Sequence, residues 1–144
     1  MKKLILLLLF IPIVFSCSRV SKKNLHNPSL NGKKVIYVYG GMDGHSPKES
    51  VDFFVPILEK EGAIVKVFNN FSVYEDEELM KEADLIIQVF TDAFSSDPRM
   101  NENQFKGLRN AIINGTGFAG WHGGLADSSP NPLYHFIVGG DFVS

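Results

Sequence analysis

The sequence predicts an α/β fold in which helices cover both faces of a parallel sheet. Along residues 33–144, segments rich in β-branched and aromatic residues alternate with amphipathic segments of helical periodicity. The run Leu85–Phe90 is almost wholly apolar, which is typical of a parallel strand that is buried on both faces. Strict alternation of strands and helices favours parallel strands that are joined by right-handed crossovers.

The first predicted strand covers residues 34–39 and runs into a pair of glycines. A helix follows, and its start carries three signals: Ser46 as N-cap, Pro47 at the first helical position and Glu49 to close a capping box. Gly62 ends this helix. Its face toward the sheet is expected to carry four apolar side chains, those of Val51, Phe54, Val55 and Leu58.

The remaining elements continue the alternation. A second strand is predicted over 64–68, followed by a short acidic helix over 75–82 that faces solvent except at Leu79 and Met80. The third strand covers 85–90, a helix follows over 101–114, and the fourth strand covers 117–121. Four strands form a thin sheet for this architecture, so we expect the fold to be incomplete.

Glycines surround a histidine where the fourth strand ends, in the sequence Gly120-Trp121-His122-Gly123-Gly124. Because glycine permits sharp turns and close backbone approach, we predict a strand-to-helix elbow that presents the imidazole of His122. Ligands of parallel α/β sheets bind beyond the carboxyl ends of the strands. His45, Asp92 and His122 all follow predicted strands, so we expect them along one rim.

Residues 1–17 are predicted to form a bacterial lipoprotein signal peptide. Two lysines precede an apolar run over 4–15, which has the length of a secretory h-region and is short of the roughly 20 residues of a membrane span. The sequence Val14–Cys17 resembles a lipobox, so we expect an acylated Cys17 to anchor an exported protein at the periplasmic face or in the outer membrane. An uncleaved signal anchor is the alternative. Residues 18–32 are predicted to be a polar tether.

Charge and cysteine content restrict the possible functions. The net charge is −2 at pH 7, and basic residues gather only near the predicted anchor, so nucleic acid is not expected as a partner. Cys17 is the only cysteine. The domain over 33–144 therefore contains neither an internal disulfide nor a catalytic thiol.

Three blocks of sequence resemble the ThuA-like (trehalose-utilisation) family, whose fold is that of class I glutamine amidotransferases. They are Gly44-His45-Ser46, the run Gly115–Gly124 and the block Val138–Phe142. The resemblance implies a flavodoxin-like or class I glutaminase-like sheet and a role in carbohydrate metabolism, on a disaccharide or a keto-sugar. Family members continue for several dozen residues past the last block, so the resemblance also implies a domain whose C-terminal part is missing.

Two hydrolytic chemistries do not fit the elbow. Glutaminase action needs a thiolate nucleophile, and His122 stands in the position that the thiol would take. Ser128 and Ser129 lack the Gly-x-Ser-x-Gly spacing of a serine nucleophile and are interpreted as turn residues.

The histidines leave two kinds of site open. With Asp92, His45 and His122 could perform general acid/base catalysis, or the two imidazoles could ligate a divalent metal such as zinc beside the carboxylate. Each histidine could instead hydrogen-bond backbone at a strand end. The sequence alone does not choose among these.

Four further positions are candidate contacts to substrate: Asp43, Trp121, Gly123 and Asp127. Trp121 could stack on a sugar ring or belong to the core. Asp43 could accept from a ligand hydroxyl or form a local turn, and Asp127 could orient His122 or cap a helix. The resulting hypotheses are an enzyme of carbohydrate metabolism, a non-catalytic sugar- or metal-binding module that serves a sugar-processing partner enzyme, and a truncated remnant without activity.

Overall fold

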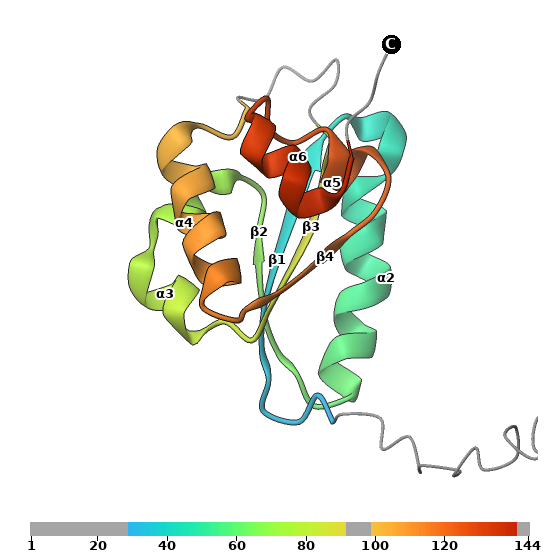
Figure 1. Cartoon of the computed structure of the whole chain (residues 1–144). Helices are drawn as coiled ribbons and strands as arrows, with labels where there is room; N and C mark the ends of the chain where they lie inside the picture. Colours follow the sequence, from blue (N-terminus) through green and yellow to red (C-terminus); the bar gives the residue numbers. More distant parts are fainter. Residues whose placement is uncertain (1–28, 92–98, 141–144) are drawn as a thin grey trace, which may run out of the picture.

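The computed structural model of the chain describes residues 29–91 and 99–140, which form one α/β unit (Figure 1). Four strands, β1 (Lys34–Gly41), β2 (Ile64–Phe68), β3 (Leu85–Thr91) and β4 (Gly117–Gly120), form a parallel sheet in the order β2-β1-β3-β4. The α-helices are α2 (Pro47–Lys60), α3 (Glu77–Glu82), α4 (Glu102–Ile113), α5 (Gly123–Ala126) and α6 (Pro132–Val138), and two short 3₁₀ helices are η2 (Asp43–His45) and η3 (Phe71–Glu75). The predicted fold class is confirmed.

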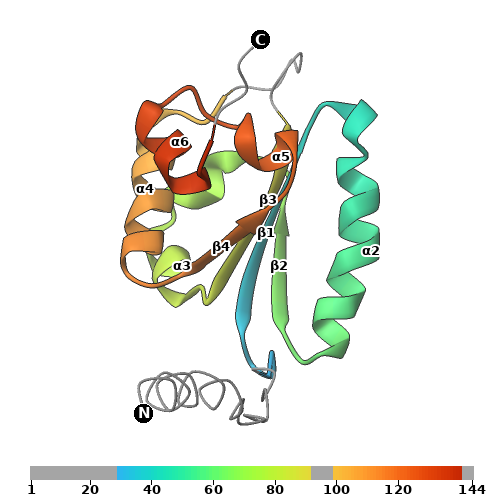
Figure 2. The same ribbon diagram turned by 45° about the vertical axis from the view of Figure 1, so that its right-hand side comes forward.

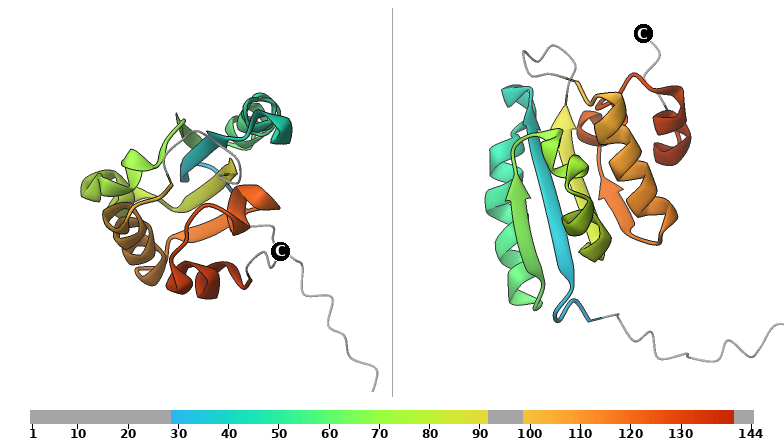
Figure 3. Two further views of the ribbon diagram at one scale, coloured as in Figure 1. Left: turned by 90° about the horizontal axis from the view of Figure 1, so that it is seen from above. Right: turned by 90° about the vertical axis from the view of Figure 1, so that its left-hand side faces the viewer.

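Helices cover both faces of the sheet, as predicted. Figure 2 shows α2 on one side of the strands and α3 with α4 on the other. Figure 3 shows the four strands side by side in the order of the ladder, with β4 at one edge. Two hydrophobic cores result, one beneath α2 around Tyr37 and Val89, and a larger one beneath η3 and α4 around Ile86 and Leu108. This arrangement places the carboxyl ends of all four strands at one rim.

Two expectations about α2 are wrong. Ser46 does not cap the helix, because it lies in the left-handed region with φ 51° and its side chain makes no capping hydrogen bond. Its backbone N–H instead closes the preceding turn by donating to the Asp43 carbonyl over 2.9 Å. Phe54 is 38% exposed rather than buried, and its ring packs against the exposed Trp121 instead of joining the core.

The other boundaries agree closely with the prediction, which missed η2, η3 and α6. Helix α4 begins after Asn101, which forms a capping box with Gln104. The acidic helix starts only at Glu77, because residues 71–75 form η3, whose Phe71, Val73 and Tyr74 are buried. A single 3₁₀ turn is too short to produce a helical periodicity, so no pattern in the sequence predicted it.

A directed chain of hydrogen bonds crosses the larger core. The Tyr74 hydroxyl donates to Gln88 Oε1 over 2.6 Å, and Gln88 Nε2 donates to the Tyr134 hydroxyl over 2.7 Å. The Tyr134 hydroxyl in turn donates to the Leu125 carbonyl. Burial raises the pKa of Tyr134 to about 12 and that of Tyr74 well above its ordinary value, so both hydroxyls keep their protons at neutral pH. The chain links η3, β3, α6 and α5.

None of the helices in the two described ranges is long and apolar enough to cross a membrane. The predicted signal peptide, the lipidation site Cys17 and most of the predicted tether lie outside the described residues.

Replacing Tyr134 with Phe should destabilise the fold. The change leaves Gln88 Nε2 without its acceptor and the Leu125 carbonyl without its donor, and each buried group left unpaired costs about 1–3 kcal/mol. Chemical denaturation measures the loss. The control is Tyr39→Phe, whose hydroxyl makes no hydrogen bond with a described residue, and which should change the free energy of unfolding by less than about 0.5 kcal/mol. Equal losses in the two variants would show that this chain of hydrogen bonds contributes nothing to the free energy of unfolding.

Candidate active site at the carboxyl ends of the strands

The predicted elbow is present at His122. Strand β4 ends at Gly120, helix α5 begins at Gly123, and His122 between them has φ 52° and ψ −145°. A positive φ is uncommon and strained for a residue with a side chain, and it persists only where the surrounding structure enforces it. The His122 carbonyl accepts hydrogen bonds from the N–H groups of Leu125 and Ala126. The imidazole is exposed at the turn.

The two glycines after His122 allow α5 to lie directly on the end of β3. A Cβ atom on Gly124 would lie 2.8 Å from Val89 Cα, so no larger residue fits between helix and strand without a shift. A Cβ atom on Gly123 would lie 3.2 Å from His45 Cε1 and 3.0 Å from Thr91 Cγ2. The His45 ring therefore packs directly against Gly123, and a larger residue at this position would crowd it.

His45 reaches the same place from the loop that follows β1. It ends η2, and its Nδ1 lies 2.8 Å from the hydroxyl of Thr91, the last residue of β3. The Met42 N–H also donates to the Thr91 carbonyl over 2.9 Å. Side chain and backbone of one buried threonine thus hold the η2 loop against the end of β3.

The two predicted histidines meet. Their ring centroids are 5.0 Å apart and the rings are inclined by 66°, an edge-to-face arrangement. Both residues are exposed, so a ligand in solvent can reach them. The prediction that His45 and His122 lie together at one rim is confirmed, while their chemical roles stay predictions.

The other candidate residues take different positions around the rim. Trp121 is 41% exposed and packs against Phe54 with ring centroids 5.0 Å apart, so it is not a core residue. Asp43 is exposed at the start of η2, and Asp127 is half-buried at the end of α5. Asp92 lies outside the described residues. Among the described residues no group of three or more His, Cys, Asp or Glu side chains could hold a metal ion, so the zinc hypothesis stays a prediction.

Sequence reasoning missed two residues that build this site. Thr91 holds His45, and its only signal was a polar residue at the end of an apolar strand. Ser128 is fully buried, and its hydroxyl lies 2.7 Å from the Phe90 carbonyl and 3.1 Å from the Gly124 carbonyl. It therefore ties α5 to β3 rather than serving only as a turn residue.

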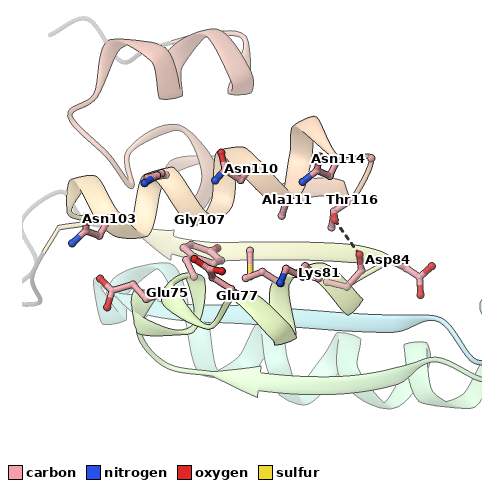
Figure 4. Close-up of a pocket in the computed structure, with 15 residues that line it drawn as sticks. Glu75, Glu77, Lys81, Asp84, Asn103, Gly107, Asn110, Ala111, Asn114 and Thr116 are labelled. Carbon is pink, nitrogen blue, oxygen red and sulfur yellow. Dashed lines mark hydrogen bonds between the residues drawn. The ribbon is translucent and has the colours of Figure 1, made fainter.

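A cavity of about 830 Å³ lies elsewhere, between α3 and α4 (Figure 4). Asn103 and Asn110 line it from α4, Asn114 lines it just after that helix ends, and Glu77 and Lys81 line it from α3. Its lining includes Asp84 and Thr116, which precede β3 and β4, so it extends to the amino ends of the strands. Ligand sites in parallel sheets lie at the opposite ends, where the histidines are.

Comparisons with known proteins agree with this architecture. Residues 34–144 match the family model ThuA, described as trehalose utilisation. Among solved structures, the chain is similar to a protein from Bacteroides uniformis ATCC 8492 described as ThuA-like, with 19% sequence identity and a TM-score of 0.60. The similarity covers 79% of this chain and 46% of that one, so this chain spans less than half the length of its structural relative. No curated protein matches the chain.

Substituting Gly124 with Ala should destabilise the domain, although alanine ordinarily favours a helix. The added methyl group would overlap the backbone of Val89, and overpacking of this kind costs about 1–3 kcal/mol. The control is Gly140→Ala, where nothing lies within 4 Å of the added atom. Thermal and chemical denaturation compare the variants. If Gly124→Ala is as stable as the control, α5 does not lie against β3.

Proposed function

The chain belongs to the ThuA family, described as trehalose utilisation, and on that premise we propose that its histidine pair is the centre of a carbohydrate-processing site. The observation that carries the proposal is the meeting of His45 and His122, whose ring centroids are 5.0 Å apart. The two imidazoles come from different loops and are exposed at the rim where ligands of parallel sheets bind.

In this proposal His122 is the general acid/base. Histidine is the side chain that most often transfers protons as a general acid or base. The elbow holds the backbone of His122 in a strained conformation, which limits the positions that its ring can reach. His45 assists from the neighbouring loop, and Asp92 orients one of the two imidazoles.

The proposed substrate is a disaccharide or an oxidised keto-sugar. Trp121 supports this choice, because an exposed indole next to the catalytic residue can stack on the apolar face of a sugar ring. Asp43 and Asp127 would accept hydrogen bonds from sugar hydroxyls, and Gly123 stays a predicted contact to the substrate.

Binding without catalysis is the second candidate function. Two adjacent imidazoles and an exposed indole suffice to hold a sugar, or with Asp92 a divalent metal such as zinc, for a sugar-processing partner enzyme. A bound metal would supply Lewis-acid chemistry at the rim. Calorimetric titration with disaccharides, with and without Zn²⁺, combined with product analysis, separates binding from turnover.

The proposed location is the membrane surface of an exported lipoprotein. Lys2 and Lys3, the apolar run over 4–15 and the lipobox-like Val14–Cys17 support this part of the proposal. Acylation of Cys17 would attach the domain through the polar segment over 18–32.

Replacing His122 with Ala should reduce sugar turnover by about 10²–10⁴-fold, the usual contribution of a general acid/base. The variant should keep its fold, because the imidazole is exposed. The measurement is product formation from disaccharides and keto-sugars by the full-length chain. His135→Gln is the matched control and should keep turnover. It also replaces a histidine, but one that lies on α6 and hydrogen-bonds the Ser129 carbonyl. Retained turnover in His122→Ala would show that His122 is not the general acid/base.

Changing Cys17 to Ser should abolish lipidation and release the protein from membranes. Serine cannot form the thioether that carries the diacylglyceryl group, and a protein without acyl chains loses the anchoring energy of about 0.8 kcal/mol per buried methylene. Fractionation of cells that express each form, with radiolabelled fatty acid, gives the comparison. The matched control is Ser18→Ala, which should still be labelled and sediment with membranes. Equal labelling of the two variants would refute the lipoprotein assignment.

A further inference from the structure

The hydroxyl of Thr91 has a single described partner, the Nδ1 atom of His45 at 2.8 Å. Thr91 is 2% exposed, so its hydroxyl cannot rely on solvent for a hydrogen bond. A threonine hydroxyl carries one proton and two lone pairs, and an imidazole nitrogen can either donate or accept. The direction of this hydrogen bond therefore decides which nitrogen of the neutral His45 ring carries the proton.

The surroundings of the hydroxyl determine that direction. If the hydroxyl accepted from a protonated Nδ1, its own proton would be buried without an acceptor, since no other hydrogen bond of this side chain occurs in the described part of the chain. Burying an unpaired donor is unfavourable, and donation to Nδ1 avoids it. We propose that Thr91 is a positioning residue that holds neutral His45 as the Nε2–H tautomer, so that His45 offers an N–H group to the ligand.

The rest of the loop supports this orientation. The Met42 N–H donates to the Thr91 carbonyl, which keeps the loop and the strand end together. The His45 ring also faces Gly123, where an added Cβ would lie 3.2 Å from His45 Cε1 and 3.3 Å from the Thr91 hydroxyl oxygen. Within the two described ranges Nε2 makes no hydrogen bond, and the residue is exposed, so this nitrogen is accessible to a ligand.

The tautomer of His45 decides which ligand groups the site would recognise. That the ligand is a sugar rests on the function proposed above. A neutral Nε2–H group binds an acceptor, so His45 would hold a carbonyl, ether or hydroxyl oxygen of the sugar. It would polarise that oxygen as a hydrogen-bond donor, while His122 moves the proton. Direct coordination of a metal by Nε2 would require the Thr91 hydroxyl to reverse and leave its own proton unpaired.

Long-range ¹H–¹⁵N correlation spectra of the full-length ¹⁵N-labelled chain test the tautomer without any substrate. The sequence has four histidines, and His45→Gln identifies the signals of His45 by their loss. At a pH where the ring is neutral, we expect the shift of a protonated nitrogen for Nε2 and that of an unprotonated nitrogen for Nδ1. The opposite pattern in the wild-type chain would overturn the proposal, whatever the variants do.

Variants at Thr91 separate positioning from packing. Thr91→Val keeps the shape but removes the hydroxyl, so the Nδ1 and Nε2 shifts of His45 should move toward those of a tautomer mixture, and Thr91→Ser should restore them. Unchanged shifts in Thr91→Val would show that the hydroxyl does not set the tautomer. Added Zn²⁺ should leave the Nε2 signal in place, and a shift of that signal to a metal-bound position would contradict the assigned preference for oxygen ligands.

Turnover assays then distinguish this inference from the proposed function. If the wild-type chain processes a sugar, Thr91→Val should lower kcat/KM while Thr91→Ser recovers it. If no form of the protein binds or processes sugars but the spectra show the Nε2–H tautomer and its loss in Thr91→Val, the proposed function fails and the assignment of Thr91 stands. If the wild-type chain shows the Nδ1–H pattern together with intact turnover, the assignment of Thr91 fails and the proposed function stands.

Discussion

The close contact between α5 and the end of β3 is the constraint on which the site depends. Gly124 lies against the backbone of Val89, and a helix can approach a strand this closely only where the side chain is absent. The chain passes from β4 to α5 through Trp121 and His122 alone, and His122 takes a positive φ in this turn. The strained residue thus stands where the chain enters α5, beside His45.

Polar groups in the core hold this contact in one arrangement. Gln88 sits in the middle of a largely apolar strand, and its side-chain amide hydrogen-bonds Tyr74 and Tyr134. The Tyr134 hydroxyl donates a hydrogen bond to the Leu125 carbonyl in α5, and the Ser128 hydroxyl donates one to the Phe90 carbonyl. Apolar packing alone would tolerate small sliding of α5 along the strand. Buried donors and acceptors do not, because each displacement would leave one of them unpaired.

His45 and His122 are neighbours, but different groups surround each of them. His45 lies against the Thr91 hydroxyl and Gly123, and its ring is held by a hydrogen bond at one nitrogen. His122 stands on the elbow itself, and its position is set by the backbone. Adjacent imidazoles with different surroundings can divide two tasks between them, one as hydrogen-bond donor to an oxygen and one as acid/base. Trp121 and Phe54 add an apolar border to the same rim.

By itself, the sequence determined the strands, the main helices and the rim on which His45 and His122 lie, because these follow from local periodicity and from the rule that parallel strands end together. It could not place Phe54, whose helical spacing suits the core but which is exposed and packs against Trp121. Nor could it show that Gln88 belongs to a buried hydrogen-bond chain, or that Thr91 holds His45. Only the tertiary structure decided these points, because each depends on groups that are remote in sequence, and hydrogen bonds between such groups leave no periodic pattern in the chain.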